Sequence, residues 1–104
     1  MSTSQSNAIA PSIVKVEGPG GVEIANGGTT NETSVTLFGY AEPAQQVEVF
    51  DSKLSKSKVA VDLTGKWTFS LSELSVGVHS ITAKALYGAG GVSQPWNFTV
   101  VPNK

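Results

Sequence analysis

The chain contains no cysteine and no arginine, and each absence removes a class of function. Without cysteine there can be no disulfide, no thiolate metal ligand and no cysteine nucleophile. Seven lysines stand against eight acidic residues, so no basic cluster is available to neutralise phosphates and nucleic acid is not expected as a partner. Only 14% of the residues are charged, and a hydrophobic core must supply the stability of the fold.

Long apolar runs and helical patterns are also lacking. No run approaches the roughly 20 residues that span a bilayer, so membrane insertion is not expected. The first eight residues lack a positive region followed by an apolar one and do not form a signal peptide; if the parent protein is exported, its signal lies elsewhere. No window has a 3.6-residue apolar period, and the segment 72–76 could form at most one helical turn.

The chain does have apolar residues at every second position, which is the pattern of a half-buried strand. Trp67, Phe69 and Leu71 show it most clearly. Seven or eight short strands follow one another at intervals of about 8–12 residues, as in sandwiches and barrels. The predicted strands are 13–16, 22–24, 34–40, 46–51, 58–62, 66–71, 78–87 and 92–101.

The strand pattern predicts one all-β domain over residues 11–101, after a flexible lead-in at 1–10 and before a tail at 102–104. Pro95 cannot donate to a central ladder, so the last strand is predicted to be an edge strand or to carry a bulge. Both tryptophans are expected in the core, each with a carbonyl partner for its indole N–H. The predicted core is Val35, Leu37, Val47, Val49, Trp67, Phe69, Leu71, Ile81, Ala83 and Trp96.

His79 is the single histidine and the first candidate for chemistry. Its neighbour Ser80 points to the opposite face of the same strand, so the two cannot form a hydrogen-bonded dyad. No base, orienting group and oxyanion donors surround it in sequence. A structural role is therefore predicted, with a ring nitrogen bonded to water or a loop carbonyl, and an enzyme is not expected.

The acidic loops and the lysines have similarly ordinary interpretations. Asp51 and Asp62 stand alone in their loops, whereas calcium takes six to eight oxygens, so weak calcium binding is left open and no metal or cofactor is predicted. The segment 62–65 reads as a type I turn that the Asp62 side chain caps, with Gly65 in the left-handed region. Lys53, Lys56 and Lys58 are expected on an exposed edge strand and the loop before it.

Phe38, Tyr40 and Phe50 share the outward parity of their strands. Exposed aromatics on a sheet can stack sugar rings or anchor a neighbouring domain. Since one parity of each strand must face the core, packing remains the alternative. These three residues are the candidate ligand or partner surface.

Seven segments in order carry a resemblance to a known family. They are APSI at 10–13, IANGGT at 24–29, VTLFG at 35–39 with AEP at 41–43, VEVFD at 47–51, GKWTF at 65–69, Leu74 with GVHSITA at 77–83, and SQPWNFTV at 93–100. The chain resembles the bacterial immunoglobulin-like repeat of large secreted and cell-surface proteins such as adhesins. The resemblance covers about residues 10–101.

The resemblance implies an Ig-like Greek-key β-sandwich of about seven or eight antiparallel strands in two sheets. It also implies a non-enzymatic spacer module of a larger exported bacterial protein, extracellular or on the cell surface, and often in tandem. Neighbouring domains would be its partners, with a carbohydrate or protein receptor as the alternative, and the module would be monomeric in isolation. Some related repeats hold calcium through an Asn in the last hairpin, where this chain has Ala89 and Gly90.

Overall fold

The computed structural model describes residues 9–102, and residues 1–8 of the predicted lead-in and 103–104 of the tail lie outside this range. Within it the structure is almost wholly β. The elements are β1 (Ser12–Glu17), the short 3-10 turn η2 (Pro19–Gly21), β2 (Gly28–Thr30), β3 (Val35–Tyr40), β4 (Gln46–Asp51), β5 (Leu54–Ala60), β6 (Lys66–Leu71), β7 (Gly77–Ala85) and β8 (Trp96–Val100).

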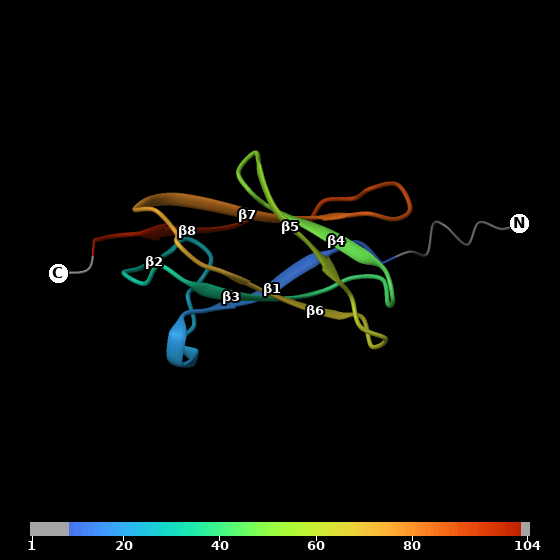
Figure 1. The fold of residues 1–104 in the computed structure, drawn as a ribbon, viewed down its shortest axis with the longest axis horizontal. Helices are drawn as coiled ribbons and strands as arrows, with labels where there is room; N and C mark the ends of the chain where they lie inside the picture. Colours follow the sequence, from blue (N-terminus) through green and yellow to red (C-terminus); the bar gives the residue numbers. More distant parts are fainter. Residues whose placement is uncertain (1–8, 103–104) are drawn as a thin grey trace, which may run out of the picture.

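The strands form two facing sheets, as predicted for an Ig-like sandwich. One sheet has three strands in the order β1-β3-β6, and the other has five in the order β2-β8-β7-β4-β5. Figure 1 shows one sheet stacked above the other, with the strands of both running roughly along the long axis of the molecule. The chain changes sheet at β1–β2, β2–β3, β3–β4, β5–β6 and β6–β7, which gives the Greek-key connections of this class.

The first part of the chain departs from the prediction. Residues 22–24 do not form a strand but make a single bridge, between Glu17 and Glu23. Instead β2 pairs in parallel with β8, from Gly28 opposite Phe98 to Thr30 opposite Val100. The chain thus joins first one sheet and then the other, and this parallel pair is an exception to the antiparallel arrangement expected.

The β4–β5 hairpin is tighter than predicted. Asp51 lies opposite Leu54, so only Ser52 and Lys53 form the turn, and Ser52 has the positive φ of 57° that such turns require. The strand therefore begins at Leu54 rather than at Lys58. It is the edge of the five-stranded sheet, and Lys56 and Lys58 lie on this edge strand with Lys53 in the turn before it, as predicted.

Of the two alternatives predicted for the last strand, the edge position is wrong, and an irregularity at Pro95 is present. β8 lies between β2 and β7, and it begins at Trp96, directly after Pro95. Upstream, Ser93 still donates its N–H to the Ala83 carbonyl, so pairing along β7 is interrupted at Pro95 and then resumes. Pro95 has no backbone N–H to donate, and this is tolerated because Pro95 lies where pairing with β7 is interrupted.

Inward-facing side chains of both sheets form one core, as predicted for eight of the ten residues named above. Phe69 and Trp96 are instead only partly buried, at the margin of the core. Phe69 lies on β6, an edge strand, and Trp96 borders the break at Pro95. The buried cluster is Val16, Ile24, Val35, Leu37, Ala41, Val47, Val49, Val59, Val61, Trp67, Leu71, Leu74, Ile81, Ala83, Phe98 and Val100.

Trp67 is one of two large aromatics buried in this core, with Phe98, and it is 2% exposed. Its indole packs against Gly39, where an added Cβ would lie 2.5 Å from the ring and 2.1 Å from the Ser12 carbonyl oxygen. The indole N–H donates to the Tyr40 carbonyl at 3.2 Å, and that of Trp96 donates to the Ile24 carbonyl at 3.1 Å. Both predicted carbonyl partners are therefore present.

The described chain enters and leaves the sandwich at opposite ends of its long axis (Figure 1). Where it enters, the Tyr87 hydroxyl donates to the Ile9 carbonyl and accepts from the Glu42 N–H at 3.1 Å. The Ile9 N–H donates to the Glu42 carboxylate at 2.8 Å. These bonds fix the incoming chain against the body of the domain.

Replacing Trp67 with alanine should lower the free energy of unfolding by about 3–5 kcal/mol, since it opens a cavity and removes the partner of the Tyr40 carbonyl. Urea melts of the two proteins measure the change. Leu63→Ala is a suitable control because Leu63 is 83% exposed, so its loss should be small. A loss below about 1 kcal/mol for Trp67→Ala would contradict the assignment of this core.

Candidate functional site

The three aromatics of the candidate surface do not form one site. Phe38 and Tyr40 lie on β3 and point outward from the three-stranded sheet, and Tyr40 is 44% exposed. Phe50 lies on β4 and points outward from the five-stranded sheet. The two outer faces are on opposite sides of the sandwich, so a ligand stacked on Tyr40 cannot reach Phe50.

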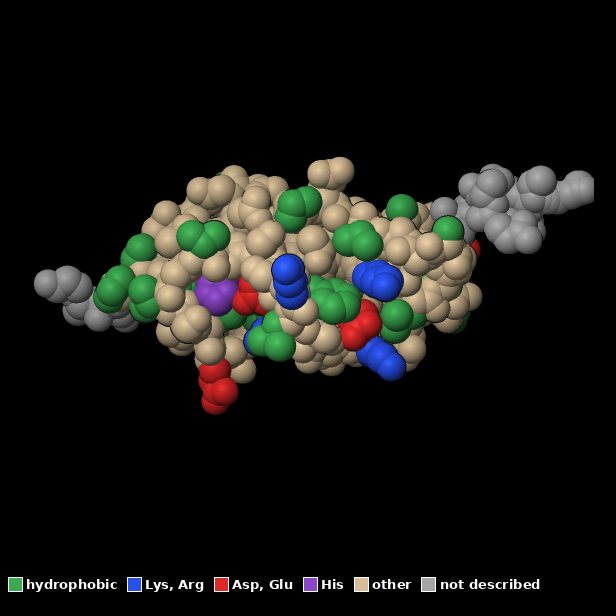
Figure 2. Space-filling view, turned by 90° about the horizontal axis from the view of Figure 1, so that it is seen from above, with side chains coloured by type: hydrophobic (Ala, Val, Ile, Leu, Met, Phe, Trp, Pro, Cys, Tyr) green, Lys and Arg blue, Asp and Glu red, His purple; other side chains and the backbone are tan. Residues whose placement is uncertain are grey.

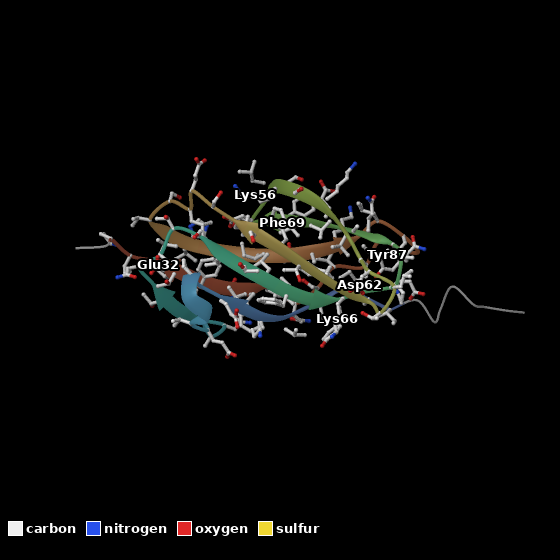
Figure 3. The ribbon with its side chains drawn as sticks, turned by 60° about the horizontal axis from the view of Figure 1, so that its bottom comes forward. Glu32, Lys56, Asp62, Lys66, Phe69 and Tyr87 are labelled. Atoms are coloured by element: carbon white, nitrogen blue, oxygen red, sulfur yellow. The ribbon has the colours of Figure 1, made fainter. Side chains whose placement is uncertain are left out.

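The outer face of the three-stranded sheet carries a shallow groove of about 400 Å³ around Phe38 and Tyr40. Its walls come from all three strands, since Phe38 lies opposite Lys15 of β1 and Thr68 of β6. Tyr40 lies opposite Lys66. Figure 3, which turns this side forward, shows Lys66 on it. The volume is within the range of small-molecule sites, about 300–1,000 Å³.

Lys15 reaches this groove because of a β-bulge. The register against β3 shifts between Ile13 and Lys15, so Val14 is an extra residue. With strict alternation, Lys15 would point inward beside Ile13. The bulge reverses the parity, which buries Val16 and places the Lys15 ammonium 4.6 Å from the centroid of the Phe38 ring.

The opposite face carries Phe50 together with lysines and acids, since Glu48 lies between Lys58 of β5 and Lys84 of β7. Figure 2, seen from the side of β4, β5 and β7, shows apolar side chains interspersed with positively charged lysines and negatively charged acids. Lys56, Lys58 and Lys53 belong to this side, and Glu48 accepts a hydrogen bond from the Ser55 hydroxyl at 2.5 Å. Mixed charge of this kind is ordinary for a solvated sheet face.

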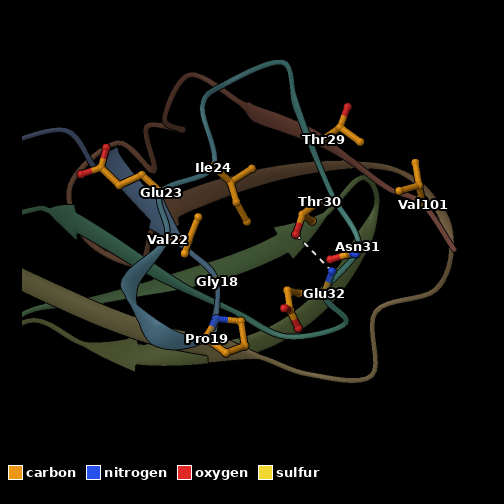
Figure 4. A pocket seen from close by; sticks show the side chains of 10 residues that line it. All are labelled: Gly18, Pro19, Val22, Glu23, Ile24, Thr29, Thr30, Asn31, Glu32 and Val101. Carbon is orange, nitrogen blue, oxygen red and sulfur yellow. Dashed lines mark hydrogen bonds between the residues drawn. The ribbon is translucent and has the colours of Figure 1, made fainter. Parts of the chain in front are cut away.

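A second pocket, of about 420 Å³, lies near the end where the chain leaves. Apolar side chains from the η2 loop and from Val101 line it, with Glu23 and Glu32 around them. In Figure 4 these two carboxylates point in different directions, so they do not converge on one point. Thr30 accepts a hydrogen bond from the Glu32 N–H at 3.1 Å, which holds the β2–β3 turn beside the pocket.

His79 is buried and both of its ring nitrogens are engaged. Nε2 lies 2.7 Å from the Ser75 carbonyl oxygen and Nδ1 lies 2.5 Å from an oxygen of Asp51. A carbonyl can only accept, so Nε2 must carry a proton. The predicted bond to a loop carbonyl is present, and Nε2, which would face a substrate in a catalytic Asp–His arrangement, is occupied by backbone instead.

Asp51 is the partner that the sequence did not indicate. It ends β4, and its other oxygen accepts from the Ser80 N–H at 3.2 Å, while the His79 ring stacks on Phe98 with centroids 5.5 Å apart. The pair therefore ties the β4–β5 hairpin to β7 and to the loop before it. Asp51 and His79 are 28 positions apart, and only the register of β4 on β7 brings them together.

Asp62 caps the β5–β6 turn as predicted. One carboxylate oxygen accepts from the Thr64 N–H at 2.9 Å, the Thr64 hydroxyl at 2.7 Å and the Lys66 N–H at 2.9 Å. Gly65 has a φ of 88°. The Thr64 hydroxyl and the Lys66 N–H are the main causes that hold the pKa of Asp62 below its ordinary value of 3.8.

Over residues 9–102, no group of three or more histidine, aspartate or glutamate side chains is placed to hold a metal ion. In the same range no helix has both the length and the apolar character needed to cross a membrane.

The architecture is that of an immunoglobulin-like β-sandwich. Among solved structures, the chain is similar to the fibronectin(III)-like modules of CbhA from Clostridium thermocellum, with a TM-score of 0.61 at 17% identity, over 86% of this chain and 98% of that one. At this identity the similarity concerns the fold. No protein-family model matches the sequence, and no curated protein matches it.

Removing either member of the His79–Asp51 pair should destabilise the domain by about 1.5–3 kcal/mol, because the remaining buried group is left without its hydrogen-bond partner. The double variant His79→Ala with Asp51→Ala should lose less than the sum of the single losses. Chemical denaturation of the four proteins measures this coupling. Ser80→Ala, which changes the other face of β7, is the control; strict additivity of the pair would contradict the assignment.

The Asp62 turn should make stability depend on pH in a defined direction. A carboxyl whose pKa is lowered by folding stabilises the fold above its unfolded pKa, near 3.8, and this contribution is lost as the pH falls through the lower folded pKa. The advantage of the protein over its Asp62→Asn variant should therefore shrink as melts are moved from neutral to acidic pH. Thr64→Val should raise the pKa of Asp62 in a carboxyl NMR titration. A pKa at or above 3.8, insensitive to Thr64→Val, would refute this account.

Proposed function

We propose that the chain is a non-enzymatic spacer module of a larger bacterial extracellular or cell-surface protein. It would be one unit of a tandem array that holds a functional domain away from the cell and supports adhesion. The observation that carries this proposal is the position of the chain ends, which lie at opposite ends of an elongated sandwich (Figure 1). Successive copies can then extend in one direction without the linker doubling back.

Two further features support a spacer. The Tyr87, Glu42 and Ile9 bonds fix the direction in which the chain enters the domain. At the other end the pocket beside Val101 offers apolar surface in which a side chain of the following domain can be buried. Neighbouring domains of the same protein are therefore the proposed partners.

The alternative from the sequence is a carbohydrate- or protein-binding module that uses Phe38, Tyr40 and Phe50. The separation of Phe50 restricts such a surface to Phe38 and Tyr40. An enzyme is disfavoured because both nitrogens of His79, the single histidine, already bond to protein groups.

A chain of two copies joined in tandem tests the spacer directly. Small-angle scattering should give a maximum dimension close to twice that of one copy, since each domain continues the axis of the preceding one. Tyr87→Phe removes the bond to Ile9 and should broaden the distribution of distances without unfolding the domain. A folded-back, compact pair would refute the proposal.

The adhesive role can be tested by replacing this domain in the parent protein. Deleting residues 11–101 should reduce adhesion, and inserting an unrelated sandwich of equal span should restore it, because only reach is required. Restoration by the native sequence alone would show that this module binds something itself.

A further inference from the structure

The groove on the outer face of the three-stranded sheet has features that a spacer does not require. Phe38 and Tyr40 are two residues apart on the central strand, so they share a face at a separation of about 7 Å. A solvated sheet face is usually polar. The aromatic pair lies on the outer face of β3 and does not fill the core, because Trp67 packs against Gly39 on the inner face of the same strand.

The charges around these aromatics are of one sign. Lys15 and Lys66 flank the aromatic pair on opposite sides, and the other residues that line the groove are uncharged. The nearest acids lie outside it: Glu17 bonds the Lys15 ammonium at 3.1 Å, and the Asp62 carboxylate is engaged by the β5–β6 turn. The Lys66 ammonium makes no ion pair within residues 9–102.

The neutral polar groups on the face are hydroxyls. Thr68 lies opposite Phe38, and in the next row Thr36 lies between Glu17, which is paired with Lys15, and Ser70, with the Thr36 and Ser70 hydroxyl oxygens 3.4 Å apart. These hydroxyls can donate to or accept from a polyol. The face therefore combines ring surfaces, neutral hydrogen-bonding groups and an unpaired cation.

We propose that this groove binds an acidic saccharide. One face of a sugar ring lies on Tyr40, its carboxylate pairs with Lys66, which is directly across the strand pair from Tyr40, and Phe38 with Lys15 forms the far wall. An aromatic face matches the apolar face of a pyranose, and the cation selects sugars that carry negative charge. The bulge at Val14 serves this site, because it alone turns Lys15 to the outer face.

This inference does not depend on the spacer role, which is tested by scattering and by module replacement. Its own test is an amide NMR titration with four probes: a uronic-acid disaccharide, its neutral counterpart, inorganic phosphate and a short polyglutamate peptide. The disaccharide should shift amides of Lys15, Phe38, Tyr40, Lys66 and Thr68. The neutral sugar should bind several-fold more weakly, and the two other anions should give no comparable shifts at these residues.

Variants separate the two contributions. Tyr40→Ala should weaken binding of both sugars by about 2–10-fold, as expected for the loss of one aromatic stacking contact. Lys66→Gln should weaken the acidic sugar alone and remove most of the salt dependence of its binding. Lys56→Gln on the opposite sheet is the matched control and should change neither. Unaltered thermal melts confirm that the variants are folded.

Each other outcome overturns the proposal. Equal binding of the neutral and acidic sugars removes the role of Lys66. Equal shifts with phosphate mean that the groove is a general anion site, and preferential binding of polyglutamate identifies it as a surface for an acidic protein segment. An absence of shifts with all four probes means that the face binds no such ligand.

Discussion

The packing of Trp67 beneath Gly39 is the contact on which the rest of the sandwich depends. The absence of a side chain at Gly39 allows the indole to approach the β3 backbone closely, and the indole N–H donates to the carbonyl of the next residue, Tyr40. The outward and inward faces of β3 are thereby linked, since the backbone that covers Trp67 also presents Phe38 and Tyr40 to solvent. A change at Gly39 would disturb the core and the outer groove together.

The class of the fold could be predicted from the sequence because alternation along β3, β4, β6 and β7 is regular and these strands carry half of the buried core. Elements that depend on pairing partners could not. β2 has only three residues and gains its place from β8, about 70 positions later, and the burial of β8 within a sheet depends on that same pairing. Pro95 correctly marked an irregularity, but its position between two paired stretches is a tertiary property.

The candidate site was predictable in part. Outward parity identified Phe38, Tyr40 and Phe50, yet parity does not say to which sheet a strand belongs, and the structure separates Phe50 from the other two. Lys15 was missed although a signal exists: Ile13 and Val16 both face inward at a spacing of three, which a strand can accommodate only with an extra residue between them. The Asp51 partner of His79 depends on register, which no local pattern contains.

The placement of the chain ends also determines how the domain responds to tension. Pulling on the two ends acts along the strands, so the hydrogen bonds that join β8 to β7 and to β2 are loaded in shear, all at once, rather than broken one after another as in a zipper. Rupture then requires many bonds to fail together. A β-sandwich connected in this way can resist a steady pull on its two ends with a mainly apolar core and no disulfide.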